Sequence, residues 1–161
     1  MLDLLAFPDA SRIWIYASDK RIPDNFIPDI HSVIQNFNNT WHSHQQELVS
    51  TGGILHNYFI VLVVDESKNI PGGCSIDKSV HFIQDLSKQY QVDFFDRMNC
   101  HYLENEEVKT IKLQDLDDAI KQNRITENTL FFDSLVSSKS QFLSEWLKPL
   151  SKSWLNKFVN L

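Results

Sequence analysis

The strongest constraint on how this chain can fold is an unbroken apolar run at residues 58–64, YFIVLVV. Its aromatic and β-branched side chains favour a strand over a helix. Because successive side chains of a strand point to opposite faces, both faces of this strand are apolar and both have to be covered. The sequence therefore predicts a central strand with a packed layer on each side of its sheet.

The flanking segments predict the elements around this strand. Residues 28–37 and 75–90 carry apolar side chains at helical spacing, whereas residues 12–16 and 92–103 have the composition of strands. Residues 92–103 and 106–113 are predicted to form a hairpin around the sequence ENE. The order strand, helix, strand, strand, helix, strand is typical of a ferredoxin-like βαββαβ core with a mostly antiparallel sheet. The handedness of the crossovers then places both helices on one face. Within residues 47–67, the bend between the two middle strands is assigned either to Asn57 or to Gly52 and Gly53.

The C-terminal part of the chain is predicted to be a helical cover for the other face. Residues 114–161 contain a short acidic helix, a strand-like stretch and an aromatic tail that Pro149 divides into two helices. We expect this tail to cover Trp14 and Tyr16, which share one face of the first strand. The alternative is an amphipathic helix for a membrane or a partner, because lysines accompany the aromatic residues Phe142, Trp146, Trp154 and Phe158.

Length and composition predict one domain over residues 1–161, with the core at 12–113 and the extension at 114–161. The net charge of −6 argues against general nucleic-acid binding, which needs a basic surface. The chain has no apolar run near the roughly 18 residues of a membrane span and no N-terminal signal sequence. We therefore expect a cytoplasmic protein whose two cysteines, Cys74 and Cys100, are free thiols.

The end of the central strand has the form of a Walker B motif. The run FIVLVV is followed by Asp65 and Glu66, which in a nucleotide hydrolase would hold Mg²⁺ and position water. That chemistry also requires a glycine-rich loop that ends in Gly-Lys-Ser/Thr, and this sequence has none. We therefore predict that the chain is not a P-loop ATPase, and keep nucleotide binding at the loop of residues 65–75 as an alternative function.

Several segments resemble a small bacterial family whose members are often labelled "ABC transporter ATPase". They are RIWIY, FIVLVVDES, GGCSIDKSVHFI, VDFFDR and SLVSSK, and they span most of the chain. The resemblance implies that the whole chain corresponds to one domain of that family. It implies no activity and no catalytic residues.

The loop PGGC before the second helix is the first candidate site. Ser75 has the chemistry of an N-cap for a helix that begins near Ile76, with Asp77 in its first turn. Cys74 then lies at the positive end of the helix dipole, where a thiolate is favoured, although Asp77 competes for that position. The candidate binding residues are Gly72, Gly73, Cys74, Ser75, Asp77, Asp65 and Arg97.

The histidines supply the other candidate groups. The candidate base for a catalytic Cys74 is His101, with His42 or His44 as alternatives. His101 lies in the same predicted strand as Cys100, on the opposite face. The alternation places Cys100 among buried side chains, and Arg97 either reads an anion or pairs with Asp93 or an acid of the tail. His42 and His44 are weak candidates for metal ligands, and without a third ligand we predict no metal and no cofactor.

A complete fold pattern without a complete catalytic set favours a small cytoplasmic binding or regulatory module over an enzyme. Its ligand is an unidentified small molecule or protein, and a homodimer through an edge strand is a further expectation. The alternative is a thiol-dependent enzyme or redox sensor that uses Cys74.

Overall fold

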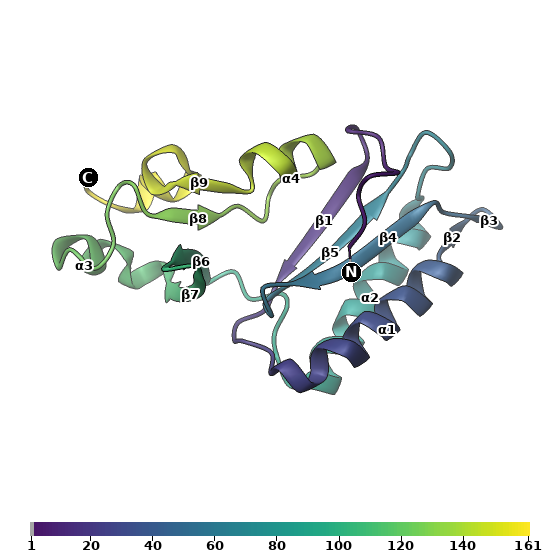
Figure 1. The fold of residues 1–161 in the computed structure, drawn as a ribbon, viewed down its shortest axis with the longest axis horizontal. Helices are drawn as coiled ribbons and strands as arrows, with labels where there is room; N and C mark the ends of the chain where they lie inside the picture. Colours follow the sequence, from purple (N-terminus) through teal and green to yellow (C-terminus); the bar gives the residue numbers. More distant parts are fainter. Residues whose placement is uncertain (1) are drawn as a thin grey trace.

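The structure is a computed structural model that describes residues 2–161. It is a mixed α+β protein whose larger sheets are both antiparallel (Figure 1). The first sheet has the order β1-β5-β4 and consists of β1 (Arg12–Ala17), β5 (Phe59–Val64) and β4 (Ser50–Leu55). Every residue of β5 is buried, which confirms that the run at 58–64 forms the central strand.

Two long helices cover one face of this sheet, α1 (Ile27–Thr40) and α2 (Gly73–Tyr90) (Figure 1). Ile34 and Ile83 of these helices pack with Ile60 and Leu62 of β5 in one buried cluster. The prediction that both helices lie on one face is therefore confirmed. Each aliphatic side chain buried in this way contributes roughly 1.5–3 kcal/mol to the free energy of folding.

The C-terminal part of the chain covers the other face, through a cluster that joins Phe59, Val61 and Val63 to Phe132 and Trp146. The ring of Phe59 lies 4.8 Å from that of Phe132 and 5.1 Å from that of Trp146. These contacts come from the end of β8 (Leu130–Phe132) and from the residue that follows α4 (Lys139–Glu145). The prediction that both faces of the central strand are covered is therefore confirmed.

The side chains of β1 lie on the opposite faces of the sheet from those predicted. Trp14 and Tyr16 pack against the helices, and Ile13 and Ile15 lie on the face that the C-terminal part covers. The register explains this, because Trp14 is opposite Leu62 of β5, and directly opposite residues share a face.

The strand expected to complete the first sheet belongs to a second sheet. This sheet has the order β7-β6-β8-β9, with β6 (Asn99–Glu104), β7 (Glu107–Lys112) and β9 (Leu147–Pro149). The predicted hairpin of β6 and β7 is confirmed, but β6 pairs with β8 and not with β1. The ferredoxin-like topology is therefore not confirmed, and Phe95 and Arg97 lie in a loop before β6 instead of in the strand.

Short elements fill the remainder of the chain. The tail has a helix, α4, before Pro149, but Pro149 itself ends strand β9, and only short 3₁₀ turns follow it. Proline is tolerated there because β9 is an edge strand. The remaining elements are η1 (Asp24–Phe26), β2 (His42–Ser43), β3 (Gln46–Glu47), η2 (Leu113–Asp115), α3 (Leu116–Lys121), η3 (Leu150–Lys152) and η4 (Trp154–Phe158).

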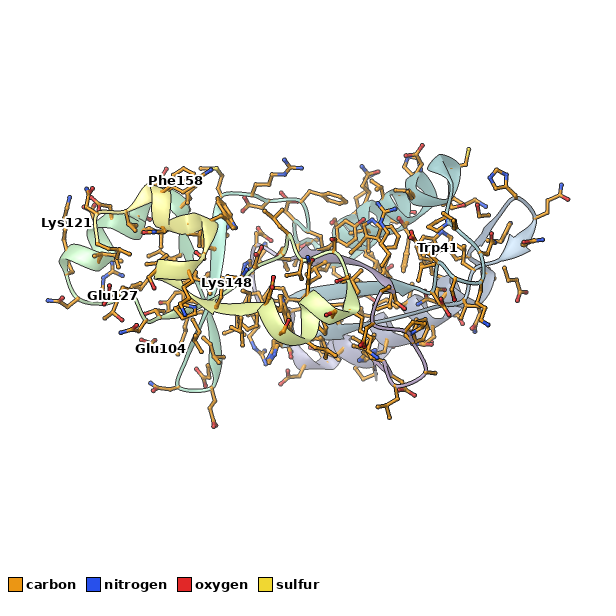
Figure 2. The ribbon with its side chains drawn as sticks, turned by 90° about the horizontal axis from the view of Figure 1, so that it is seen from above. Trp41, Glu104, Lys121, Glu127, Lys148 and Phe158 are labelled. Carbon is orange, nitrogen blue, oxygen red and sulfur yellow. The ribbon has the colours of Figure 1, made fainter. Side chains whose placement is uncertain are left out.

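The two sheets define two lobes at opposite ends of the molecule. We call residues 2–92 the N-terminal lobe, and residues 99–132 with 147–161 the C-terminal lobe. Figure 2 shows Trp41 within the first, and Glu104, Lys121 and Lys148 grouped in the second. The C-terminal lobe has a core of its own, which includes Cys100, Phe131 and Leu150. Among residues 2–161, no helix combines the length and apolar character that crossing a bilayer demands.

The two glycine pairs have different structural roles. His56 and Asn57 form the turn between β4 and β5 with φ of 53° and 60°, so Asn57 marks the bend and Gly52 and Gly53 lie inside β4. A Cβ on Gly52 would lie 2.8 Å from the backbone oxygen of Val61 and 3.1 Å from the Asn38 side chain. Gly52 therefore allows α1 to approach the sheet closely.

This difference predicts opposite effects of alanine at two glycines. Gly52→Ala should lower the free energy of unfolding by about 1–3 kcal/mol, because a backbone oxygen cannot move out of the way. Gly73→Ala should leave it unchanged or raise it by up to about 1 kcal/mol, because Gly73 begins α2 and a Cβ there meets no described atom within 4 Å. Urea denaturation of both variants measures the difference, and equal effects would contradict the tight packing around Gly52.

Candidate functional site

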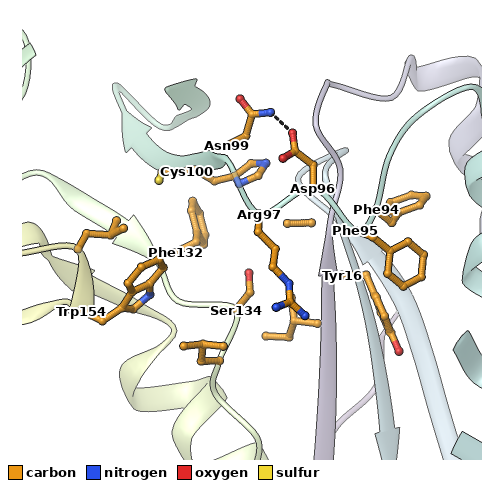
Figure 3. Close-up of a pocket in the computed structure, with 15 residues that line it drawn as sticks. Tyr16, Phe94, Phe95, Asp96, Arg97, Asn99, Cys100, Phe132, Ser134 and Trp154 are labelled. Carbon is orange, nitrogen blue, oxygen red and sulfur yellow. Dashed lines mark hydrogen bonds between the residues drawn. The ribbon is translucent and has the colours of Figure 1, made fainter. Parts of the chain in front are cut away.

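A groove of about 520 Å³ lies between the two lobes, along the outer edge of β1. Figure 3 shows its walls, with Tyr16 and Phe95 on one side and Phe132 and Trp154 on the other. The volume is within the range of sites that bind small ligands. Two further cavities, of about 520 and 690 Å³, are lined mainly by polar surface residues.

The groove meets β1 along its edge. Ile15, Tyr16 and Ala17 all line it, although successive side chains of a strand point to opposite faces. A cavity that all of them line has to face the edge of the strand, where its backbone groups lie. This is the edge at which β6 was expected to pair.

Arg97 is the charged side chain that extends into the middle of the groove (Figure 3). It comes from the loop between α2 and β6 and is exposed. The expected pair with Asp93 or with an acid of the tail is not formed, and within residues 2–161 no carboxylate lies within 4 Å of its guanidinium nitrogens. The neighbouring Asp96 instead accepts hydrogen bonds from the side chain of Asn99 and the backbone N–H of Met98.

The loop that carries Arg97 is held by hydrogen bonds where it begins, at Asp93. Asp19 donates its backbone N–H to the carbonyl of Asp93 at 3.0 Å, and its carboxylate accepts the N–H of Asp93 at 2.8 Å. The carboxylate of Asp93 in turn accepts the N–H of Phe95 at 2.8 Å. Arg97 is therefore presented from a loop that is anchored to the end of β1 by hydrogen bonds and by Phe95, whose ring lies 5.6 Å from that of Tyr16.

Cys100 and His101, at the start of β6, form the floor of the groove. Burial, and to a lesser extent Asp96, raises the pKa of the Cys100 thiol to about 11, so the thiol is protonated at neutral pH. Burial lowers the pKa of His101, and a hydrogen bond to the Ser18 carbonyl partly offsets this shift. The distance from His101 Nε2 to that oxygen is 2.7 Å, and because a carbonyl only accepts, Nε2 carries the proton.

The structure separates the predicted cysteine loop from this groove. Arg97 and His101 line the groove, whereas Cys74 and Asp65 do not. Cys74 lies at the start of α2, beyond the Val64 end of β5, and His101 contacts Phe59 at the other end of that strand. Six strand residues span about 17 Å, so the predicted pairing of Cys74 with His101 is not formed.

The backbone of the cysteine loop is already engaged by the chain itself. Gly72 precedes α2 and donates its N–H to the Ser43 hydroxyl at 3.1 Å. The expected N-cap, Ser75, is instead buried inside the helix, where its hydroxyl donates to the carbonyl of His42 at 2.9 Å. Asp77 lies beyond the first turn of α2, because the helix begins earlier than the spacing indicated. Cys74 itself is exposed.

The acids that resembled a Walker B motif have structural partners. The Asp65 carboxylate accepts hydrogen bonds from the backbone and hydroxyl of Ser67, at 3.0 and 2.6 Å, and so closes the turn after β5. Glu66 lies 3.4 Å from Arg12, whose guanidinium also stacks over Trp14. These contacts hold the ends of β1 and β5 together.

The histidine pair lies in the hairpin of β2 and β3. His42 is in β2, and His44 is in the turn with a φ of 51°. His42 Nδ1 is 2.5 Å from the carbonyl of Thr40. The part of the chain that the structure describes contains no group of three or more histidine, cysteine or acidic side chains arranged to hold a metal ion.

Comparisons of the chain with protein-family models, with curated proteins and with solved structures found no match. The resemblance to the family labelled "ABC transporter ATPase" therefore stays a prediction.

The two thiols should react at very different rates. Cys74 is exposed, whereas Cys100 is 7% exposed and has a pKa of about 11. We expect one fast alkylation by iodoacetamide at pH 8, at Cys74, with Cys100 reacting only after denaturation. Mass spectrometry over time measures both sites, and Cys74→Ala should remove the fast reaction. Fast labelling of Cys100 in the folded protein would contradict its protonated, buried state.

His101 should make stability depend on pH. Its pKa is lower in the folded protein than in the unfolded chain, so the unfolded chain takes up the proton first as pH falls. The stability that the neutral ring contributes is present above about pH 6.5 and is lost progressively below it. His101→Gln keeps a hydrogen-bond donor but does not titrate. Urea denaturation between pH 7 and pH 5 should therefore show a smaller loss for His101→Gln than for the wild type, and equal losses would contradict a depressed pKa.

Proposed function

We propose that the protein is a binding module whose ligand occupies the groove between the lobes. The observation that carries this proposal is the Arg97 guanidinium, which extends into an aromatic groove and has no acidic partner among the described residues. A cavity with mainly apolar walls and one unpaired charged side chain is typical of a site that binds a ligand and fixes its orientation. Asp96, the other charged residue of the lining, is engaged by Met98 and Asn99. The ligand should combine an apolar body with an anionic group.

The floor of the groove supports binding more than catalysis. The Cys100 thiol is protonated at neutral pH and is a poor nucleophile in that form. The Nε2 proton of His101 is committed to the Ser18 carbonyl, and the ring packs against Tyr58 and Phe59. Both groups therefore form a neutral floor under a charged side chain.

The arrangement of the N-terminal lobe also supports this proposal. Its strands and helices follow the order of a ferredoxin-like core up to the second helix, and β1 lies at an edge. We include in the proposal that this lobe is an incomplete ferredoxin-like core, with the groove at the place of the missing strand. We also include a cytoplasmic location, in keeping with two free cysteines.

A fluorescent probe with the expected chemistry tests the site. 1-Anilinonaphthalene-8-sulfonate combines aromatic rings with a sulfonate, and we expect saturable binding with a stoichiometry near one. Arg97→Glu should weaken binding about tenfold or more, because it replaces the charge partner of the sulfonate with a like charge. Trp154→Ala should weaken it through loss of an aromatic wall that is 42% exposed.

Arg124→Glu is the matched control. Arg124 is exposed in the C-terminal lobe, lies outside the groove and bonds to Gln122, so its variant should bind the probe within about twofold of the wild type. Urea denaturation of each variant shows whether it is folded, because partly folded chains also bind this probe. Binding that is unsaturable, or equal in Arg97→Glu and Arg124→Glu, would refute the site.

A further inference from the structure

We propose that the ligand is an extended segment of a partner protein, which pairs as an added strand with the outer edge of β1 and places an acidic side chain against Arg97. This inference rests on the proposed function, because it assigns a ligand class to the same groove. Strand addition of this kind uses main-chain hydrogen bonds for affinity and side-chain pockets for specificity.

The hydrogen-bond pattern of β1 shows which backbone groups face the groove. In an antiparallel strand, alternate residues direct their N–H and C=O groups to opposite sides. Ile13 donates its N–H away from β5, to Ser137, whereas Ser18 donates to Tyr58 on the β5 side. Ile15 and Ala17 share the direction of Ile13, so their N–H and C=O groups point into the groove.

These groups are free of hydrogen bonds within the described chain. No backbone or side-chain group of residues 2–161 bonds to the N–H or C=O of Ile15 or Ala17 on that side. Such groups bond to water or to a ligand, and an extended peptide offers the matching donors and acceptors. Most side chains that line the groove beside them are apolar, Arg97 is the cation, and the acidic Asp96 is engaged by Met98 and Asn99.

The edge is closed on both sides of this free stretch. Ile13 bonds to Ser137 at 3.0 Å, and Asp19 bonds to Asp93 at 3.0 Å. Ile13 and Asp19 lie six residue steps apart, about 20 Å along the strand, and the five residues between them leave room for roughly five extended residues of a ligand. The closed ends favour a single extended chain over the edge of a second folded sheet, so they favour a peptide segment over a second copy of this protein.

The chemistry of the walls indicates what this segment carries. Phe95, Leu135 and Trp154 are large apolar side chains that line the groove and are 39%, 73% and 42% exposed. Arg97 lies between Phe95 and Trp154 (Figure 3) and has no acidic partner among the described residues, in a protein of net charge −6. The complementary peptide has apolar, β-favouring residues on either side of an aspartate or glutamate.

The outer edge of β7 provides a contrast within the same molecule. Its side chains include Glu107, Lys109 and Lys112, all exposed, and charges of this kind discourage pairing with another strand. The residues of β1 that border the groove, Ile15 to Ala17, have no charged side chain. The one charged residue of β1, Arg12, lies outside the groove and pairs with Glu66. The charged edge of β7 is therefore protected against pairing, whereas the uncharged edge of β1 is suited to binding a strand.

The full-length protein can be tested with a random octapeptide display library. We expect selected peptides to be enriched in one Asp or Glu among β-branched or aromatic residues, and their affinity to fall about tenfold or more in Arg97→Glu but not in Arg124→Glu. Hydrogen exchange measured by NMR should show fast exchange at Ile15 and Ala17 and slow exchange at Trp14 and Tyr16 in the free protein. The bound peptide should slow exchange at Ile15 and Ala17.

Peptides with alternate N-methylation provide the control for strand pairing. Methyl groups on the amides that face β1 should weaken binding about tenfold, whereas methyl groups on the other amides should have little effect. Equal effects of both patterns, no slowing at Ile15 and Ala17, or no acidic enrichment would overturn strand addition. A dimer in analytical ultracentrifugation that protects these amides without peptide would overturn it in favour of a second copy. If the sulfonate probe still binds through Arg97, the proposed function survives that failure.

Discussion

The burial of β5 on both faces is the constraint on which the rest of the structure depends. Its alternating side chains have to be covered by two different layers, and the chain supplies them from different sources. The helices α1 and α2 cover one face, and Phe132 and Trp146 of the later chain cover the other. This second layer brings the C-terminal lobe beside β1 but leaves it short of pairing with that strand. The groove is the space that remains between the C-terminal lobe, which packs on the face of the first sheet, and the outer edge of β1, with which the strands of that lobe do not pair.

Local pattern predicted the elements well and their pairing less well. The helices of residues 27–40 and 73–90, the central strand and the hairpin around residue 105 all carry strong periodicity or turn chemistry. Which sheet receives β6 depends instead on β8 and β9, strands of three residues each whose signals in the sequence are weak. The prediction of which side chains of β1 face the helices was wrong for a similar reason. It depends on the register of β1 with β5, which is set by residues far apart in the sequence.

The candidate site shows the same limit. The Gly-Gly-Cys loop has a recognisable local pattern, but its groups bond to Ser43 and His42 in a small hairpin whose position the sequence did not reveal. The groove is assembled from β1, the loop before β6, the end of β8 and the turn at Trp154. Arg97 and His101 could be named as candidates from their residue types, whereas Leu135 and Trp154 carry no signal that separates them from ordinary surface or core residues.

The short free stretch of β1 also bears on how the protein avoids aggregation. An exposed strand edge is a template for unwanted pairing, and most proteins protect it with charges, bulges or a covering segment. In this protein β1 is protected because the free part of its edge is short. Ser137 and Asp93 occupy the edge on either side of Ile15 and Ala17. An edge this short gives too few main-chain bonds for stable growth into fibrils unless side chains add affinity. The segments around Ser137 and Asp93 therefore protect the protein against edge-to-edge aggregation. Loss of either hydrogen bond would lengthen the part of the β1 edge that is free to pair with another strand.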